Sequence, residues 1–248
     1  MNNSLKNKDL IQIQLNLNRI ILYVLIFCLA AEAVIFFLDI FLNIAELWYM
    51  EKFKRFSNVA MESSFGTWFS VVQNFIVGIT ALIISMHYRF ISKNRGGFIC
   101  WLLTALFFAY ISLDDHLVLH ERMGGSITVF AGWLFGKNIT LPTYGWLFLF
   151  GPLFGAFGIF FLVFMYRELR TRKFRLILIT GLFLWGAAVL LDAWDGMGHS
   201  YEWIVNGTGL KKIYIRHCFM LFEEMLEMLG STLFLYLFLS KFKLLTAP

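Results

Sequence analysis

Six long apolar segments, separated by short polar stretches, dominate the pattern of this chain. A helix of about 20 mostly apolar residues crosses the hydrocarbon core of a bilayer, and each segment is about that long. The pattern therefore predicts an all-α polytopic integral membrane protein with six transmembrane helices in a single domain, residues 1–248. The predicted spans are residues 20–47, 68–90, 98–119, 144–166, 176–194 and 217–240.

A further apolar stretch, residues 126–136, follows the third span and is too short to cross the membrane. It predicts an interfacial or re-entrant segment. Small residues recur along two of the spans, where they would allow helix backbones to approach closely. These residues are Gly151, Gly155 and Gly158 in the fourth span and Gly181 and Gly186 in the fifth.

Composition agrees with a membrane protein, since 59% of the residues are hydrophobic and only 15% are charged. The net charge of +5 does not indicate nucleic-acid binding, because the cations cluster beside the apolar spans and form no basic surface domain. Cys28, Cys100 and Cys218 are scattered and lack a CxxC partner, which argues against a thiolate zinc site. The expected partners are the lipid bilayer and other membrane proteins.

The distribution of lysine and arginine predicts the orientation of the chain. In this topology 13 of the 21 basic residues lie on the side that holds both termini. Cytoplasmic loops carry the excess of lysine and arginine in membrane proteins. Both termini are therefore predicted to be cytoplasmic.

Acids and histidines show the opposite distribution, because all but two of the 16 acids and four of the five histidines lie within the spans or toward the outer face. Ionisable groups in a membrane are costly unless they are paired, hydrated or bound to a cation, and they usually mark functional sites. Three segments rich in such groups fall at the predicted outer ends of three spans. These segments are residues 112–121, 191–199 and 217–227.

Spacing within these segments indicates which side chains share a helix face. Residues three or four positions apart stack on one face and can bind one ion together. The resulting prediction is a carboxylate–histidine metal site, with Glu121 as a general base for a metal-bound water. The predicted metal ligands are Asp114, His120, Asp192, Asp195, His199, Glu224 and Glu227.

The residue types of this set indicate a divalent transition metal. Imidazole and carboxylate without thiolate suit zinc, iron or manganese. Facing carboxylates also occur in di-iron and di-manganese helical bundles, but those use Glu-x-x-His pairs, whereas this chain has Asp-x-x-Asp and Glu-x-x-Glu. One zinc ion and a di-iron or di-manganese centre therefore both remain open. The leading hypothesis is a membrane metalloenzyme, a hydrolase or an oxidoreductase acting on a lipid or other apolar substrate.

A structural alternative applies to each of these acids. Asp114, Glu224 or Glu227 could pair with a nearby cation such as Arg216 or Lys212, and groups at the span ends could simply be hydrated.

Two further functions remain open. One is a cation or proton transporter or channel, although the cytoplasmic halves of the third to fifth spans are almost entirely apolar. The other is an accessory subunit of a larger membrane complex. The residues that would line a transport route are Glu32, Asp39, Asp114, Asp192 and Glu224.

Overall fold

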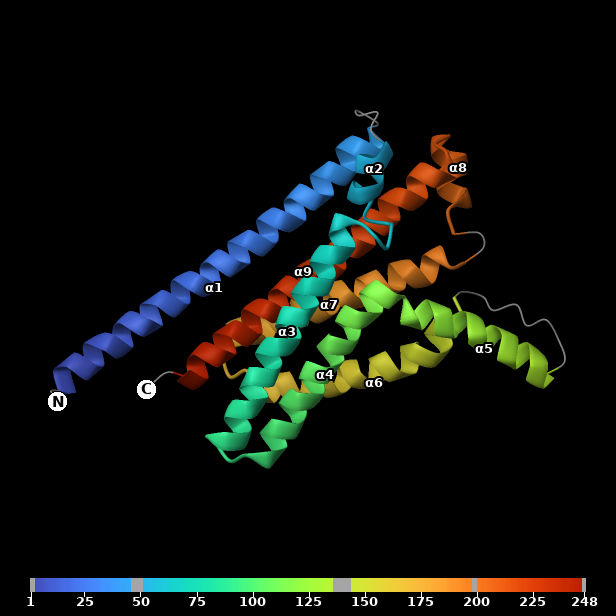
Figure 1. The fold of residues 1–248 in the computed structure, drawn as a ribbon. Coiled ribbons are helices and arrows are strands. Elements are labelled where there is room, and N and C mark those ends of the chain that lie inside the picture. The colour runs from blue at the N-terminus through green and yellow to red at the C-terminus, as the bar shows by residue number, and fades with distance from the viewer. Residues whose placement is uncertain (1–2, 46–50, 136–143, 198–199, 247–248) are drawn as a thin grey trace.

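The structure is a computed structural model that describes residues 3–45, 51–135, 144–197 and 200–246. All regular structure in these ranges is helical, and six helices are long and apolar enough to cross a membrane. The predicted all-α polytopic fold is confirmed. The first residues of α1 and the last residues of α9 lie at the same end of the bundle, as six crossings require (Figure 1).

The helices follow one another with short connections. Five of the six spanning segments each lie within a single α-helix. The first spanning segment also includes a π-helical turn, η1. The elements are α1 (Asn3–Asp39), η1 (Ile40–Ile44), α2 (Glu51–Ser57), α3 (Phe65–Phe90), α4 (Arg95–Leu117), α5 (Leu119–Phe135), α6 (Trp146–Glu168), α7 (Arg172–Asp195), α8 (Glu202–Thr208) and α9 (Lys212–Thr246). The spanning segments are Asn16–Ile44, Phe65–Phe90, Arg95–Leu117, Phe150–Glu168, Arg172–Asp195 and Lys212–Thr246.

Polar side chains at the ends of the apolar runs start three of these helices. Ser64 accepts a hydrogen bond from the Thr67 amide at the start of α3, at 3.1 Å. Asn94 begins α4 and Thr171 begins α7 in the same way. An N-cap of this kind satisfies one of the amides that the first helical turn leaves without a partner. The capping residues therefore determine where each span begins.

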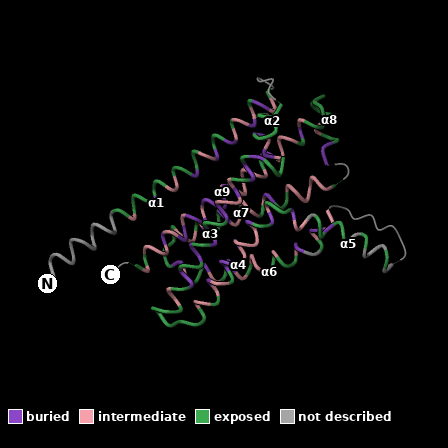
Figure 2. The backbone as a smooth tube through the Cα atoms, in the orientation of Figure 1, coloured by how far each residue is buried: buried purple, intermediate pink, exposed green. Residues whose placement is uncertain are grey.

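Helices α3 and α9 form the centre of the bundle. α3 packs along α4 and α9, and α9 packs along α7 and α1. About half of the apolar window of α3 and of α9 is buried, against 22% for α1. Figure 2 shows the same contrast, with buried positions concentrated in the central helices and exposed positions along much of α1. The apolar outer face of α1 therefore faces the lipid.

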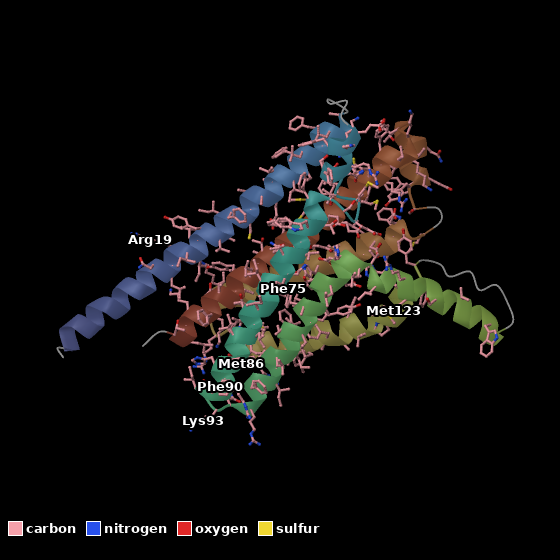
Figure 3. All side chains as sticks on the ribbon, in the orientation of Figure 1. Arg19, Phe75, Met86, Phe90, Lys93 and Met123 are labelled. Atoms are coloured by element: carbon pink, nitrogen blue, oxygen red, sulfur yellow. The ribbon has the colours of Figure 1, made fainter. Side chains whose placement is uncertain are left out.

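The two ends of the bundle differ. The short helices α2 and α8 lie at one end, which we call the α2–α8 end (Figure 1). Phe90 and Lys93 mark the turn between α3 and α4 at the opposite end (Figure 3). The segments rich in acids and histidines in the sequence, at the end of α4, the end of α7 and the start of α9, all belong to the α2–α8 end.

The predicted short segment after the third span falls largely in α5, a helix of 17 residues. The chain turns between α4 and α5 at Val118, whose φ of 52° and ψ of 43° are left-handed. α5 then packs against α6, where a Cβ on Gly124 would lie 2.5 Å from the Trp146 amide. Figure 1 shows α5 pointing away from the bundle. Gly136 lies outside the described residues.

The predicted close packing of glycines is correct at one position and wrong at four. A Cβ on Gly181 would lie 2.9 Å from the Phe234 ring, so α7 and α9 approach closely there. At the other four positions an added Cβ would meet no atom within 4 Å, because these positions border an internal cavity and face no neighbouring helix closely. The four are Gly151, Gly155, Gly158 and Gly186.

Candidate functional site

A cavity of about 940 Å³ lies between α3, α4, α6, α7 and α9. One part of its lining is acidic and comes from the α2–α8 end of these helices. Two basic side chains, His120 and Arg216, line it as well. The acids that line it are Glu62, Asp114, Asp115, Asp192, Asp195, Glu223, Glu224 and Glu227.

The remaining lining is apolar and largely aromatic. Ligand pockets in proteins typically combine such walls with a few convergent polar groups. A glycine face on α6 leaves the space open, since side chains at those positions would project into it. The cavity therefore has an acidic part and an apolar part. The apolar part is lined by Phe107, Phe108, Phe154, Phe157, Phe161, Leu182, Trp185, Val189, Leu190 and Phe234.

Asp114 and His120, two of the predicted metal ligands, are bonded to each other. Asp114 Oδ2 lies 2.6 Å from His120 Nδ1, and Asp114 Oδ1 accepts a hydrogen bond from the His120 amide at 2.9 Å. The left-handed turn at Val118 brings the start of α5 back over the end of α4. A carboxylate on Nδ1 is the arrangement that orients metal-binding histidines elsewhere, and a metal would then bind Nε2. Asp114 thus fits an orienting role.

Asp115 was not among the predicted site residues, and the structure directs it into the acidic part of the cavity. Its Oδ2 accepts hydrogen bonds from Ser70 Oγ at 2.7 Å and from Asn74 Nδ2 at 3.1 Å, both on α3. These bonds fix the carboxylate in place. The adjacent Asp-Asp pair in the sequence and the polar residues of the second span were the available signals.

The acids of α9 complete this group. Glu223, Glu224 and Glu227 stand within four residues of one another and line the cavity. Glu224 and Glu227 both interact electrostatically with Asp115 on α4 and Asp192 on α7. We call the five residues Asp115, Asp192, Glu223, Glu224 and Glu227 the acid cluster. A bound cation relieves the repulsion between neighbouring carboxylates.

Asp195 is occupied by a different set of bonds. Its carboxylate forms an ion pair with Arg216, with 2.7 Å between Oδ2 and Nη2, and accepts hydrogen bonds from Tyr144 Oη at 2.7 Å and Tyr201 Oη at 2.9 Å. Burial raises the pKa of both phenols, and the Asp195 carboxylate raises each pKa further. The phenols therefore remain donors. Asp195 is thus bound to a cation and two phenols, and we leave it out of the acid cluster.

Glu32 and Asp39, the two acids of the first span named for a transport route, point inward, away from the lipid. Glu32 is 1% exposed and Asp39 is fully buried. Asp39 Oδ1 lies 2.5 Å from His217 Nε2 on α9, and Asp39 Oδ2 accepts a hydrogen bond from the Val59 amide at 2.7 Å. Neither acid lines the cavity. Asp39 and His217 thus tie the end of α1 to the start of α9.

The remaining predicted site residues lie outside the described part of the structure: His199, and the side chain of Glu121. Within the described residues, no three histidine, cysteine, aspartate or glutamate side chains are already placed to hold a metal ion. The acid cluster would have to draw its oxygens together around an ion. Its members come from α4, α7 and α9, as the sequence predicted for the site.

The sequence profile of one protein family, described as "Domain of unknown function (DUF8692)", matches residues 19–242. The chain belongs to this family. The match covers all six spans apart from the outermost turns of the first and last, so the cavity and the acid cluster lie within the family domain. No curated protein and no solved structure matches the chain.

Proposed function

We propose that this protein is a membrane metalloenzyme that acts on a lipid or another apolar substrate bound in the cavity. One observation carries the proposal: a single cavity of about 940 Å³ combines a cluster of carboxylates with an aromatic, glycine-lined apolar part. The apolar part of the cavity suits the hydrocarbon portion of the substrate, and the acid cluster is where the chemistry would occur. Both parts belong to the same cavity, so a substrate bound in the apolar part would reach the carboxylates.

Electrostatics support a cation at the acid cluster. Five carboxylates from three helices line the cavity, and the nearby Arg216 is paired with Asp195. A divalent ion would relieve the repulsion between these carboxylates. A carboxylate-rich set, with His120 beside it, suits manganese or iron, alone or as a pair, better than it suits zinc. Such an ion acts as a Lewis acid and activates a bound water or dioxygen.

The apolar core favours an enzyme over a transporter. Large buried side chains fill the bundle beyond the cavity, toward the turn between α3 and α4. Ile84, Trp101 and Phe238 are at most 1% exposed, and the ring centroids of Trp101 and Phe238 lie 5.1 Å apart. A route through the membrane needs polar groups or water along its full length. The buried side chains of this region are mainly apolar, and the buried hydroxyls of Ser85 and Thr104 are bonded to backbone carbonyls, so we do not propose transport.

Elemental analysis of purified full-length protein tests the metal. We expect stoichiometric manganese or iron after exposure to either ion, and little retained calcium, because the His120 imidazole beside the cluster is a nitrogen ligand, which calcium does not prefer. Asp195→Asn is the control that should keep the metal, since Asp195 is bonded to Arg216. A wild-type protein that retains no transition metal would contradict the proposal.

Filling the apolar part tests the substrate class. Gly155 lines the cavity, and nothing lies within 4 Å of an added Cβ, so Gly155→Leu should occupy space meant for a hydrocarbon chain. We expect binding of a long-chain monoacylglycerol to weaken about tenfold or more, equivalent to about 1.4 kcal/mol, while the metal content stays unchanged. Gly207→Leu on α8 is the matched control, because Gly207 is open and lies away from the cavity. Equal binding by the two variants would count against an apolar substrate.

A further inference from the structure

A second polar group lies buried between α1, α3 and α9, separate from the cavity lining. Glu32 of α1, Gln73 of α3 and Thr232 of α9 form its centre, and each is at most 3% exposed. Gln73 Nε2 donates to Glu32 Oε1 at 3.0 Å and to Thr232 Oγ1 at 2.6 Å. Thr232 Oγ1 donates to the same Glu32 Oε1 at 2.6 Å. Three helices therefore converge on one carboxyl group.

The hydrogen bonds of this group are incomplete in one specific way. Gln73 Nε2 has two hydrogens and Thr232 Oγ1 has one, and the three bonds above use all of them. Two buried oxygens, Glu32 Oε2 and Gln73 Oε1, have no partner. When the Glu32 carboxyl group is ionised, both oxygens can only accept hydrogen bonds. The centre then has two buried acceptors for which it has no donor.

The charge of Glu32 is also uncompensated. No basic side chain of the described residues pairs with it, and its closest titratable neighbour is the Cys28 thiol on the preceding turn of α1. α3 and α9 face it with an amide and a hydroxyl. An ionised carboxylate without a cation is very costly in an apolar interior. The four side-chain oxygens of the centre also fall short of the six or more that calcium takes.

We propose that Glu32 is a buried proton-binding site whose carboxyl group is neutral at physiological pH. A proton on Oε2 removes the charge and turns one unpartnered acceptor into a donor. One proton therefore removes both the uncompensated charge and one of the two surplus acceptors. This inference is independent of the metal, because no residue of the acid cluster contacts Glu32.

The position of this site connects it to the cavity wall. Gln73 and Thr232 are each next in sequence to a residue that lines the cavity, Asn74 and Ser231. Ser231 Oγ donates to Asn74 Oδ1 at 2.9 Å, and Asn74 donates to Asp115. Two pairs of polar side chains, Gln73 with Thr232 and Asn74 with Ser231, thus lie between Glu32 and the acid cluster.

Infrared difference spectroscopy of the full-length protein in lipid nanodiscs tests this site. At neutral pH, the wild-type spectrum minus that of Glu32→Gln should contain the carbonyl stretch of a protonated carboxylic acid, which shifts when D₂O replaces H₂O. Glu168→Gln is the matched control. Glu168 pairs with Lys241 at 2.6 Å, so its difference spectrum should contain carboxylate bands alone. Carboxylate bands for Glu32, with or without added sodium, would overturn the proposal.

The folding of the variant gives a second test. The amide of Glu32→Gln presents an acceptor and a donor where the neutral acid presents them, so the thermal unfolding temperature should match that of the wild type. Glu32→Ala should unfold at a clearly lower temperature, because it leaves the Gln73 and Thr232 donors without their acceptor. A Glu32→Gln protein that does not fold would therefore also overturn the proposal.

Discussion

Replacing Glu224 and Glu227 together by glutamine is expected to lower the affinity for Mn²⁺ by more than about 100-fold, since loss of a residue that merely supports a ligand already costs about 10–100-fold. Both side chains line the cavity and interact with Asp115 and Asp192, so the change removes two charges from the centre of the acid cluster. Glutamine keeps the volume and leaves the helix intact. Isothermal titration with Mn²⁺ and Fe²⁺ measures the change.

Two controls separate this effect from general damage. Glu168→Gln alters an acid at the other end of the bundle and should leave Mn²⁺ affinity unchanged. Asp115→Asn should weaken binding on its own, whereas Asp195→Asn should reduce stability and not affinity. If the double variant bound Mn²⁺ as tightly as the wild type, the acid cluster would not be the metal site.

Gly230→Ala is expected to lower the free energy of unfolding by about 1–3 kcal/mol, the usual cost of overpacking a well-packed interior. A Cβ on Gly230 would lie 2.4 Å from Trp185 Cδ1 and 3.3 Å from the Gly181 carbonyl oxygen. The Trp185 indole is held by a hydrogen bond from Nε1 to the Glu227 carbonyl oxygen at 3.0 Å, so it cannot move without losing that bond. Chemical denaturation in detergent measures the loss.

Gly186→Ala is the matched control on the facing helix. Nothing lies within 4 Å of its added Cβ, so the change should be neutral or stabilise by about 0.5–1 kcal/mol, because alanine favours the helix. Trp185 lines the cavity, and Gly230→Ala should therefore also reduce monoacylglycerol binding. Equal stability of the two variants would show that α7 and α9 can separate at little cost.

The spans could be predicted from the sequence because hydropathy is a property of a whole segment. Their ends were less exact. α9 extends from Lys212 to Thr246, beyond the predicted residues 217–240, because a helix does not stop where the apolar run stops. The sequence also predicted that the end of α4, the end of α7 and the start of α9 lie at one end of the bundle. The number of membrane crossings between these three points places them on the same side of the membrane.

Individual site residues were harder to predict, and Asp115 shows why. Asp114 and Glu121 are seven residues apart, which places them on one face of a continuous helix. Val118 adopts a left-handed conformation and ends α4, so this phase is lost. A valine at this position does not indicate such a turn in the sequence. Asp115 lies on α4 before the turn and is held by Ser70 and Asn74, contacts that depend on how α4 packs against α3.

The bonds of Asp195 show a second limit. Its partners Tyr144, Tyr201 and Arg216 are far from it along the chain or belong to connecting segments, and hydropathy does not position connectors. The glycines of α6 show a third. The same small residue permits close packing at Gly181 and leaves open space at Gly155, and only the neighbouring helix decides between the two.

Helix α6 is fastened to the bundle along its length. Glu168 at its last turn bonds to Tyr88 and Lys241, Tyr144 just before its first turn bonds to Asp195, and Phe157 near its middle stacks on Phe107 of α4. Pro152 lacks the amide hydrogen that would tie it to the preceding turn, a common cause of bending in helices. Any bending of this helix would therefore centre on Pro152, between the bond of Tyr144 and the ring contact of Phe157.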